Sequence, residues 1–347
     1  MSAASASVSL LDMGIIVVAT GVIWKGSSWL ESSSERLASY YGLPEVVQGA
    51  IIAAIGSSFP ELASVVFAAL FAGAIELGVG AIVGSAIFNI LVIPALAGIV
   101  TDDHIEANRT LVYKEAQFYM LAVSVLLITF ALAVIYYPDT SPGAAELAGY
   151  VTRPLALLPI GLYGLYIFIQ IQDTGDYEAG DEDVSHIDVR RQWAFLLAGL
   201  LVILIAVERL VHSVDLIGQS LGIAPFIMGV TVIAAATSLP DALVSVRAAR
   251  DERGVASIAN VLGSNTFDLL VAIPVGVLIV GQASIDFAMA VPMFASLTGA
   301  TILLFTVLRT DLTLTGLESI ALLVTYVGFV AWVVLEATNV IVGVLPK

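Results

Sequence analysis

Residues 56–62 of this chain read Gly56-Ser57-Ser58-Phe59-Pro60-Glu61-Leu62, and 180 residues later the chain reads Ala236-Thr237-Ser238-Leu239-Pro240-Asp241-Ala242. A second pair follows in the same order: Val83-Gly84-Ser85-Ala86-Ile87-Phe88-Asn89 and, at an offset of 179, Leu262-Gly263-Ser264-Asn265-Thr266-Phe267-Asp268. Two paired motifs in matching order indicate that the chain consists of two homologous halves.

A proline lies inside an apolar run in each copy of the first motif. Pro60 and Pro240 have no N–H to donate and crowd the carbonyls of Gly56 and Ala236, so each helix is expected to break or kink. Backbone groups freed at membrane depth are tolerated only where they are buried in protein or line a cavity. Paired breaks in corresponding helices are typical of a midplane transport site.

The composition is that of a membrane protein. Of 347 residues, 59% are hydrophobic and 12% charged, with a mean hydropathy of +1.01, whereas soluble chains are about 25% charged. The absence of cysteine excludes disulfides and thiolate sites, and three histidines do not favour zinc. A net charge of −16 argues against a nucleic-acid partner.

Ten apolar runs are long enough for a hydrocarbon core of roughly 30 Å, which about 20 helical residues span. We therefore predict an all-α integral membrane protein with ten transmembrane helices and the lipid bilayer as its surroundings. The predicted spans are 13–30, 46–72, 77–100, 116–136, 155–171, 193–216, 226–248, 256–280, 287–308 and 317–344.

An acidic stretch, residues 173–191, separates the fifth and sixth runs. We expect residues 1–172 to form the first repeat, 173–191 a linker and 192–347 the second repeat. Because five spans per half is an odd number, the second half enters the membrane in the opposite orientation, and the repeat is predicted to be inverted.

Basic residues predict the orientation, since Lys and Arg favour the cytoplasmic side. With an outer N-terminus, only Arg153 and Lys347 clearly lie outside. This indicates a multi-pass protein of the cell membrane with both termini extracellular and the acidic linker cytoplasmic. The inner side then holds Arg36, Arg109, Lys114, Arg190, Arg191, Arg247, Arg250, Arg253 and Arg309.

Each motif places oxygen atoms on one helix face. In the first motif two hydroxyls lie three and four residues before the acid, and in the second a hydroxyl lies four residues before an amide or acid. The residues are Ser57, Ser58 and Glu61; Thr237, Ser238 and Asp241; Ser85 and Asn89; and Ser264 and Asp268.

Three carboxylates at membrane depth are costly, on the order of 2.5–3.5 kcal/mol each on insertion scales, unless cations or protons neutralise them. The donor set of carboxylate, amide, hydroxyl and carbonyl oxygens suits hard cations, and calcium and sodium fit it best. An empty site is too costly to pass through the dehydrated occluded state, which favours exchange over uniport.

These motifs resemble the cation/calcium exchanger superfamily, whose two repeats carry a G-T-S-x-P-E type motif followed by G-S-N-x-x-[ND]. The similarity covers nearly the whole chain, and the combination is most similar to the potassium-dependent sodium/calcium exchangers. It implies Glu61 and Asp241 as central calcium and sodium ligands, and carbonyls near Ala54 and Ala234 as sodium ligands. It implies potassium dependence from Asp268. Around these it places Asn89, Ser57, Ser58, Ser85, Thr237, Ser238 and Ser264.

The resemblance implies a secondary active antiporter, not an enzyme, with no cofactor and no obligatory protein partner. The chain departs from the commoner prokaryotic pattern at Ser57, Ala236, Ala86 and Asp241, which leaves the coupling ion open. A calcium/proton exchanger is the nearest alternative, because protons can neutralise the same acids. A calcium channel and an intramembrane aspartyl protease using Asp241 and Asp268 are more remote alternatives.

Overall fold

The computed structural model describes residues 10–42, 54–72, 75–101, 105–106, 114–142, 144–173, 187–310, 312–338, 340–341 and 345. Its first half contains α1 (Leu10–Tyr40), α3 (Ala54–Ser57), α4 (Phe59–Phe67), η2 (Ala68–Ala72), α5 (Ile75–Val100), β1 (Ile105–Glu106), α6 (Ala116–Tyr136), β2 (Ala148–Thr152) and α7 (Arg153–Asp173). The second half contains α8 (Val189–Leu221), α9 (Pro225–Met228), η4 (Gly229–Ile233), α10 (Ala234–Thr237), α11 (Leu239–Arg250), α12 (Gly254–Phe267), η5 (Asp268–Ala272), α13 (Ile273–Val280), β3 (Gln282–Asp286), α14 (Phe287–Arg309), β4 (Thr313–Leu314) and α15 (Gly316–Ala337).

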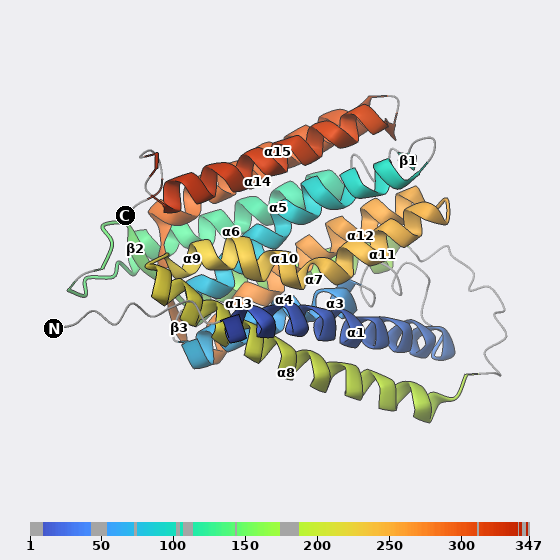
Figure 1. Ribbon diagram of the computed structural model, residues 1–347, viewed down its shortest axis with the longest axis horizontal. Coiled ribbons are helices and arrows are strands. Elements are labelled where there is room, and N and C mark those ends of the chain that lie inside the picture. Colours follow the sequence, from blue (N-terminus) through green and yellow to red (C-terminus); the bar gives the residue numbers. More distant parts are fainter. Residues whose placement is uncertain are drawn as a thin grey trace.

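The chain is a bundle of apolar helices (Figure 1). Among the described residues, eight helices are long and apolar enough to cross a membrane, and a ninth span results if the bent pair α9–α10 and α11 is counted as one. The second predicted span, 46–72, begins in residues 43–53, which lie outside the described ranges. Its described part consists of α3, α4 and η2.

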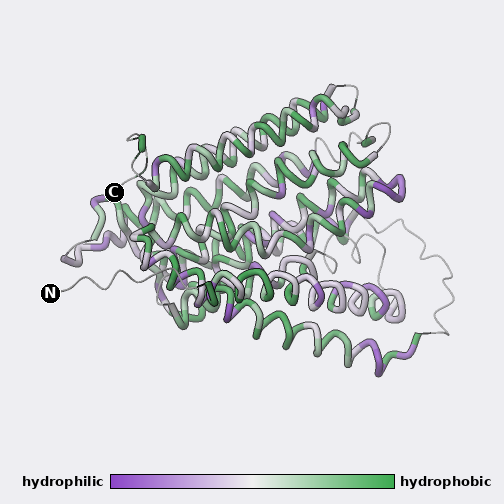
Figure 2. The backbone as a smooth tube through the Cα atoms, viewed as in Figure 1, coloured by the Kyte–Doolittle hydropathy of each residue, from purple (hydrophilic) through white to green (hydrophobic). Residues whose placement is uncertain are grey.

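Two spans form the centre of the bundle. The apolar window of α5 is 83% buried and that of Gly254–Val280 is 72% buried, whereas the values for α1 and α15 are 22% and 17%. A helix that is apolar all round belongs inside, and one with a single packed face belongs at the edge. Figure 2 shows the hydrophilic residues gathered mainly at the ends of the helices.

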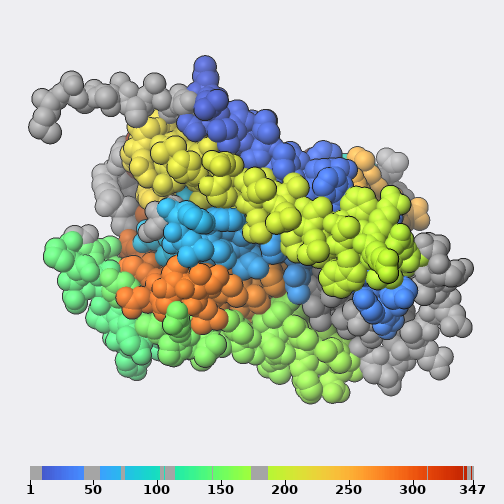
Figure 3. Space-filling model, turned by 90° about the horizontal axis from the view of Figure 1, so that it is seen from below, coloured from blue at the N-terminus to red at the C-terminus, as the bar shows by residue number. Residues whose placement is uncertain are grey.

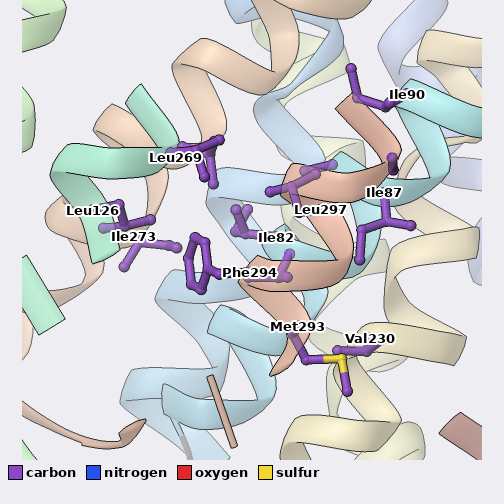
Figure 4. Close-up of a cluster of buried hydrophobic side chains, with 14 of the residues drawn as sticks. Ile82, Ile87, Ile90, Leu126, Val230, Leu269, Ile273, Met293, Phe294 and Leu297 are labelled. Atoms are coloured by element: carbon purple, nitrogen blue, oxygen red, sulfur yellow. The ribbon is translucent and has the colours of Figure 1, made fainter. Parts of the chain in front are cut away.

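A large hydrophobic cluster packs α5 against its neighbours (Figure 4). Ile82 and Ile87 of α5 are fully or almost fully buried, as are Phe294 and Leu297 of α14. Phe294 also makes an edge contact with Phe130 of α6, with ring centroids 5.7 Å apart. This apolar packing fixes the position of α5, which carries one copy of the second motif.

The helices α1 and α8 pack together along one side of the bundle, and Figure 3 shows them lying side by side across its lower face. Their backbones approach closely at Gly26 and Gly199, where a Cβ added to Gly199 would lie 2.8 Å from the Gly26 carbonyl oxygen. Both helices are longer than the predicted spans 13–30 and 193–216, because polar residues continue them beyond the apolar runs.

Two small antiparallel sheets, which the sequence analysis did not predict, join the helices of this mostly helical fold. β1 pairs with β4, and β2 pairs with β3, and the two sheets lie at opposite ends of the bundle (Figure 1). Extended segments between helices have backbone groups to pair, and a strand partner satisfies them.

Asp139 lies close to the β2–β3 sheet. Its carboxylate accepts hydrogen bonds from the Ser141 N–H and from the hydroxyl of Ser284 in β3. The hydrogen bonds from the Ser141 side chain and backbone lower the pKa of Asp139 to about 2.

Candidate cation site

Both predicted proline breaks are present. α3 ends at Ser57 and α4 begins at Phe59, while α10 ends at Thr237 and α11 begins at Leu239 with a bend of 44°. The prolines occupy the first turns of α4 and α11. Glu61 and Asp241 follow in the same turns, where the positive end of the helix dipole stabilises negative charge.

The ten polar side chains predicted for the site all lie inside the bundle. Each is at most 1% exposed, and they come from the two broken helices, from α5 and from the α12–η5 segment. These side chains are Ser57, Ser58, Glu61, Ser85, Asn89, Thr237, Ser238, Asp241, Ser264 and Asp268.

Asp241 lies at the centre of a hydrogen-bond network that joins both halves. Its Oδ1 accepts a bond of 3.1 Å from the Ser264 hydroxyl, and its Oδ2 accepts one of 3.0 Å from Asn89 Nδ2. The Ser57 hydroxyl lies 3.1 Å from that of Ser264 and also interacts with Asp241. Residues far apart in the chain thus meet at one carboxylate.

The hydroxyls of the first motif lie beside acids of the opposite half. The helical spacing predicts that Ser57 and Ser58 accompany Glu61, whereas Ser57 interacts with Asp241. Ser58 instead lies beside Asp268, and Thr237 lies beside Glu61.

Ser238 completes the exchange between halves, since its hydroxyl donates a bond of 2.7 Å to the hydroxyl of Ser85. Ser85 is predicted to share a helix face with Asn89, and it lies in the same helix, α5. The two copies of the motifs therefore form one site, with oxygens of one half opposite those of the other.

Several buried oxygens in this site have no hydrogen-bond partner among the described residues. They are both carboxylate oxygens of Glu61, both of Asp268, Oδ1 of Asn89 and the hydroxyl of Ser58. Thr237 and Ser58 lie near the carboxylates but lack hydrogen-bond geometry to them. Glu61 also interacts electrostatically with Asp268 and Asp241. Buried acceptors of this kind are stable only with a hydrogen-bond donor, a proton or a cation beside them.

The site is not a cage of carboxylates alone. Within the described ranges, no three acidic or histidine side chains are close enough together to hold a metal ion by themselves. A cation here would have to use neutral oxygens as well. Of the two backbone carbonyls predicted as sodium ligands, that of Ala234 accepts the Ser238 N–H at 3.0 Å. Ala54 is the first residue of α3, the short helix that ends at the break.

Asn265 is a site residue that the sequence analysis did not single out. Its Oδ1 accepts a 3.0 Å bond from Asn89, and its Nδ2 donates to the Ala86 carbonyl at 3.1 Å and to the Tyr119 hydroxyl at 3.3 Å. Its place between Ser264 and Asp268 in the second motif is the signal that could have identified it.

The glycines of the motif region allow close packing around the site. A Cβ added to Gly84 of α5 would overlap the backbone of Val230 in η4, and one added to Gly80 would overlap the Phe226 carbonyl of α9. Small residues let helix backbones approach in membranes. This contact brings the second broken helix against α5.

A multi-span helical bundle with unpartnered oxygens buried at paired helix breaks defines a membrane transporter for cations. The sequence pattern of the family described as sodium/calcium exchanger protein matches residues 11–172 and 191–335. The chain therefore belongs to the sodium/calcium exchanger family.

Similar proteins span nearly the whole chain. An uncharacterised membrane protein of Methanocaldococcus jannaschii is 28% identical over 83% of this chain and 88% of its own length. The sodium/calcium exchanger MaX1 of Methanosarcina acetivorans is 24% identical over 92% of this chain and 98% of its own length. The human sodium/potassium/calcium exchanger 4 is 46% identical, but over only 66 residues, which are 19% of this chain and 11% of that protein.

The fold is that of a solved exchanger. The structure of the sodium-calcium exchanger NCX_Mj at 10 mM sodium without calcium superposes with a TM-score of 0.63 at 23% identity, covering 93% of this chain and 98% of that one. Family and fold together identify a transporter and not an enzyme. This removes the intramembrane aspartyl protease from the alternatives.

Proposed function

We propose that this chain is a secondary active antiporter that exchanges sodium for calcium across the membrane by alternating access. One observation carries the proposal: the oxygens of Glu61, Asp268, Asn89 and Ser58 are buried inside the bundle without a hydrogen-bond partner in the described residues, and Glu61 interacts electrostatically with Asp268 and Asp241. Carboxylate, amide and hydroxyl oxygens are the ligands that calcium and sodium accept. The relatives named sodium/calcium exchanger support the same ions.

We assign the ligand roles as the family resemblance implies them. Glu61 and Asp241 are the central ligands for calcium and sodium, with Asn89 and Asp268 beside them. The neutral oxygens of the remaining predicted residues complete the coordination: Ser57, Ser58, Ser85, Thr237, Ser238, Ser264 and the carbonyls of Ala54 and Ala234. Exchange follows because buried carboxylates left without a cation are too costly to carry across the occluded state.

The architecture we propose is ten transmembrane helices in two inverted repeats, 1–172 and 192–347, joined by the linker 173–191. The pairing of β1 with β4 at one end and β2 with β3 at the other supports an inverted relation. Aromatic contacts support it too, because Tyr163 packs on Phe267 and Tyr326 packs on Phe88, the residue that matches Phe267 in the first motif copy.

The proposed orientation places the protein in the cell membrane with both termini outside. The helix ends that carry most of the basic residues, including the start of α8 and the α11–α12 junction, lie at one end of the bundle (Figure 1). Arg153, at the start of α7, lies by the β2–β3 sheet at the other end, where it donates to the Leu278 carbonyl. The Lys and Arg bias supports a cytoplasmic side at the first end.

Potassium co-transport is an additional part of the proposal. Asp268 is a carboxylate where the matching position of the other half is the amide Asn89, so the site has one more negative charge than an amide pair would give. The 66-residue match to the human sodium/potassium/calcium exchanger 4 supports a likeness to that branch.

The test is calcium uptake into proteoliposomes driven by an outward sodium gradient, with and without potassium. Wild type is expected to take up calcium, and Glu61→Gln to lose uptake because the central carboxylate is gone. Asp268→Asn is expected to alter the potassium dependence. Glu208→Gln is the matched control, since Glu208 pairs with Arg209 on α8 away from the site. Wild-type uptake that requires a pH gradient and ignores sodium would establish a calcium/proton exchanger instead.

A further inference from the structure

Two of the paired positions in the second motif carry different side chains in the two halves of the site. The motif offset places Asn89 opposite Asp268 and Ala86 opposite Asn265. Asn89 Nδ2 donates to the side chain of Asn265. The matching neighbour of Asp268 is Ala86, whose methyl group offers no hydrogen bond. Both oxygens of Asp268 accordingly have no hydrogen-bond partner within the described ranges.

Tyr163 of α7 presents a second unpartnered group at the same place. Its side chain is only 7% exposed, and its hydroxyl has no hydrogen-bond partner among the residues described. Its ring meets that of Phe267 edge-on at 5.8 Å, so it packs on the residue directly before Asp268, and it interacts electrostatically with the Asp268 carboxylate.

The neighbouring tyrosine shows that such a hydroxyl can be satisfied in this part of the protein. Tyr166, one turn further along α7, donates a bond of 3.3 Å to Glu115, and Gln170 donates to the same carboxylate at 2.9 Å. The Tyr163 ring lies 5.9 Å from that of Tyr166. A buried hydroxyl and a buried carboxylate near each other, both without a protein partner, leave a position for a third species between them.

The second half contains the matched tyrosine. Tyr326 of α15 meets Phe88 edge-on at 5.5 Å, and Phe88 precedes Asn89 as Phe267 precedes Asp268. The ring contact is therefore the same, but the neighbouring site residue is an amide instead of a carboxylate. Any effect specific to the Tyr163 hydroxyl beside a charge should be absent at Tyr326.

We propose that the Tyr163 hydroxyl is an additional oxygen ligand for a monovalent cation held at Asp268. Ser58, whose hydroxyl lies beside Asp268 and has no hydrogen-bond partner in the described ranges, is the further neutral ligand. One carboxylate with neutral hydroxyls balances the single charge of a monovalent cation. Calcium has two positive charges, and its proposed ligands include the two carboxylates of Glu61 and Asp241. This proposal rests on the proposed exchange function.

The experiment compares wild type, Tyr163→Phe, Tyr326→Phe and Ala86→Asn in detergent and in proteoliposomes. Thermal unfolding is followed by tryptophan fluorescence while lithium, sodium, potassium or rubidium chloride is titrated, with choline chloride holding ionic strength constant. Calcium uptake is measured over the same cation series. The titration reports binding, and the uptake assay reports transport.

Wild type is expected to be stabilised by one of these cations. Tyr163→Phe is expected to raise the half-saturating concentration of that cation about tenfold, the effect of losing one contact to a charged group. Tyr326→Phe should stay within about twofold of wild type, a difference of a few tenths of a kcal/mol. Ala86→Asn is expected to weaken binding of the same cation, because by the motif symmetry its amide would take the place beside Asp268 that Asn265 takes beside Asn89.

An unchanged cation response in Tyr163→Phe would overturn the assignment, and so would equal losses in Tyr163→Phe and Tyr326→Phe, because those would reflect ring packing. Unfolding without added cation shows that each variant is folded. Wild-type protein that takes up no calcium against sodium would overturn the proposed function itself. Normal wild-type exchange with an unchanged Tyr163→Phe variant would overturn only the ligand assignment.

Discussion

Asn265 links the two halves of the cation site through every polar atom of its side chain. It accepts from Asn89, which also donates to Asp241, and it donates to a backbone carbonyl of α5 and to Tyr119. Because Asn89 and Asn265 are both fully buried, these bonds are shielded from competing water. The amide thereby sets the direction in which Asn89 presents its unpartnered Oδ1 to the site.

Replacing Asn265 by Ala is expected to destabilise the protein by about 2 kcal/mol, since buried groups left unsatisfied cost about 1–3 kcal/mol. It should also weaken calcium binding, because Asn89 loses one of its two anchors. Thermal unfolding and calcium-dependent stabilisation in detergent measure the two effects. Asn260→Ala is the control: Asn260 donates one bond to Ser245 in α11, so a smaller loss of stability and unchanged calcium binding are expected. Equal behaviour of the two variants would contradict the proposed role.

The residue types of the site were predictable, but their partners were not. Duplication of the motifs identified the ten polar side chains, because chance does not repeat serine, proline and acid in that order. The contact of Ser57 with Asp241 was not predicted, because spacing along one helix does not say which residues another helix brings close. Asn265 was not singled out because its role depends on contacts with α5 and α6, which no local pattern contains.

At the scale of the elements, α5 is the axis on which the site is assembled. It is buried along most of its apolar length, and it contacts the second broken helix through Gly80 and Gly84 without intervening side chains. Three π-helical turns, η2, η4 and η5, adjoin the motif helices. Such turns are frequent at functional sites because they shift the register of one helical turn.

Gly84→Ala should separate α5 from η4, because the added methyl group overlaps the Val230 backbone, which cannot rotate away. Overpacking of this kind costs about 1–3 kcal/mol, so a lower unfolding temperature and reduced uptake are expected. Gly164→Ala in α7 is the matched control, since its Cβ meets nothing within 4 Å. There the better helix propensity of alanine should leave stability unchanged or slightly raised. A Gly84→Ala protein as stable as wild type would disprove the close-packing argument.

The spans were largely predictable from hydropathy, and both breaks from the prolines. The helix ends were not, because the polar ends of α1 and α8 continue the helix beyond the apolar run. The strands were not predicted either. Each has two to five residues and pairs with a segment more than a hundred positions away, so its stability comes from the partner strand and not from its own sequence.

At the scale of the whole molecule, α1 and α8 form a pair at the edge of the bundle. Their apolar windows are 22% and 33% buried, against 83% for α5, and the pair crosses the bundle surface together (Figure 3). Alternating access requires one part of the protein to move against another. A weakly buried pair of helices that packs on itself can move while disturbing few contacts with the centre of the bundle.

Tying α1 to the first broken helix should therefore stop transport. A Cβ at Gly56 would lie 3.5 Å from the Ser34 hydroxyl oxygen and no closer than that to any other atom, so cysteines at these positions fit and can be bridged. The chain has no native cysteine, so no other disulfide can form. We expect the oxidised Ser34→Cys/Gly56→Cys protein to lose sodium-driven calcium uptake and to regain it with a reductant, while each single variant keeps uptake under both conditions. The lack of free thiols verifies that the bridge has formed. If the bridged protein then transports at the wild-type rate, α1 does not move relative to the first broken helix. Movement of another part of the bundle would then have to open the site to each side of the membrane in turn.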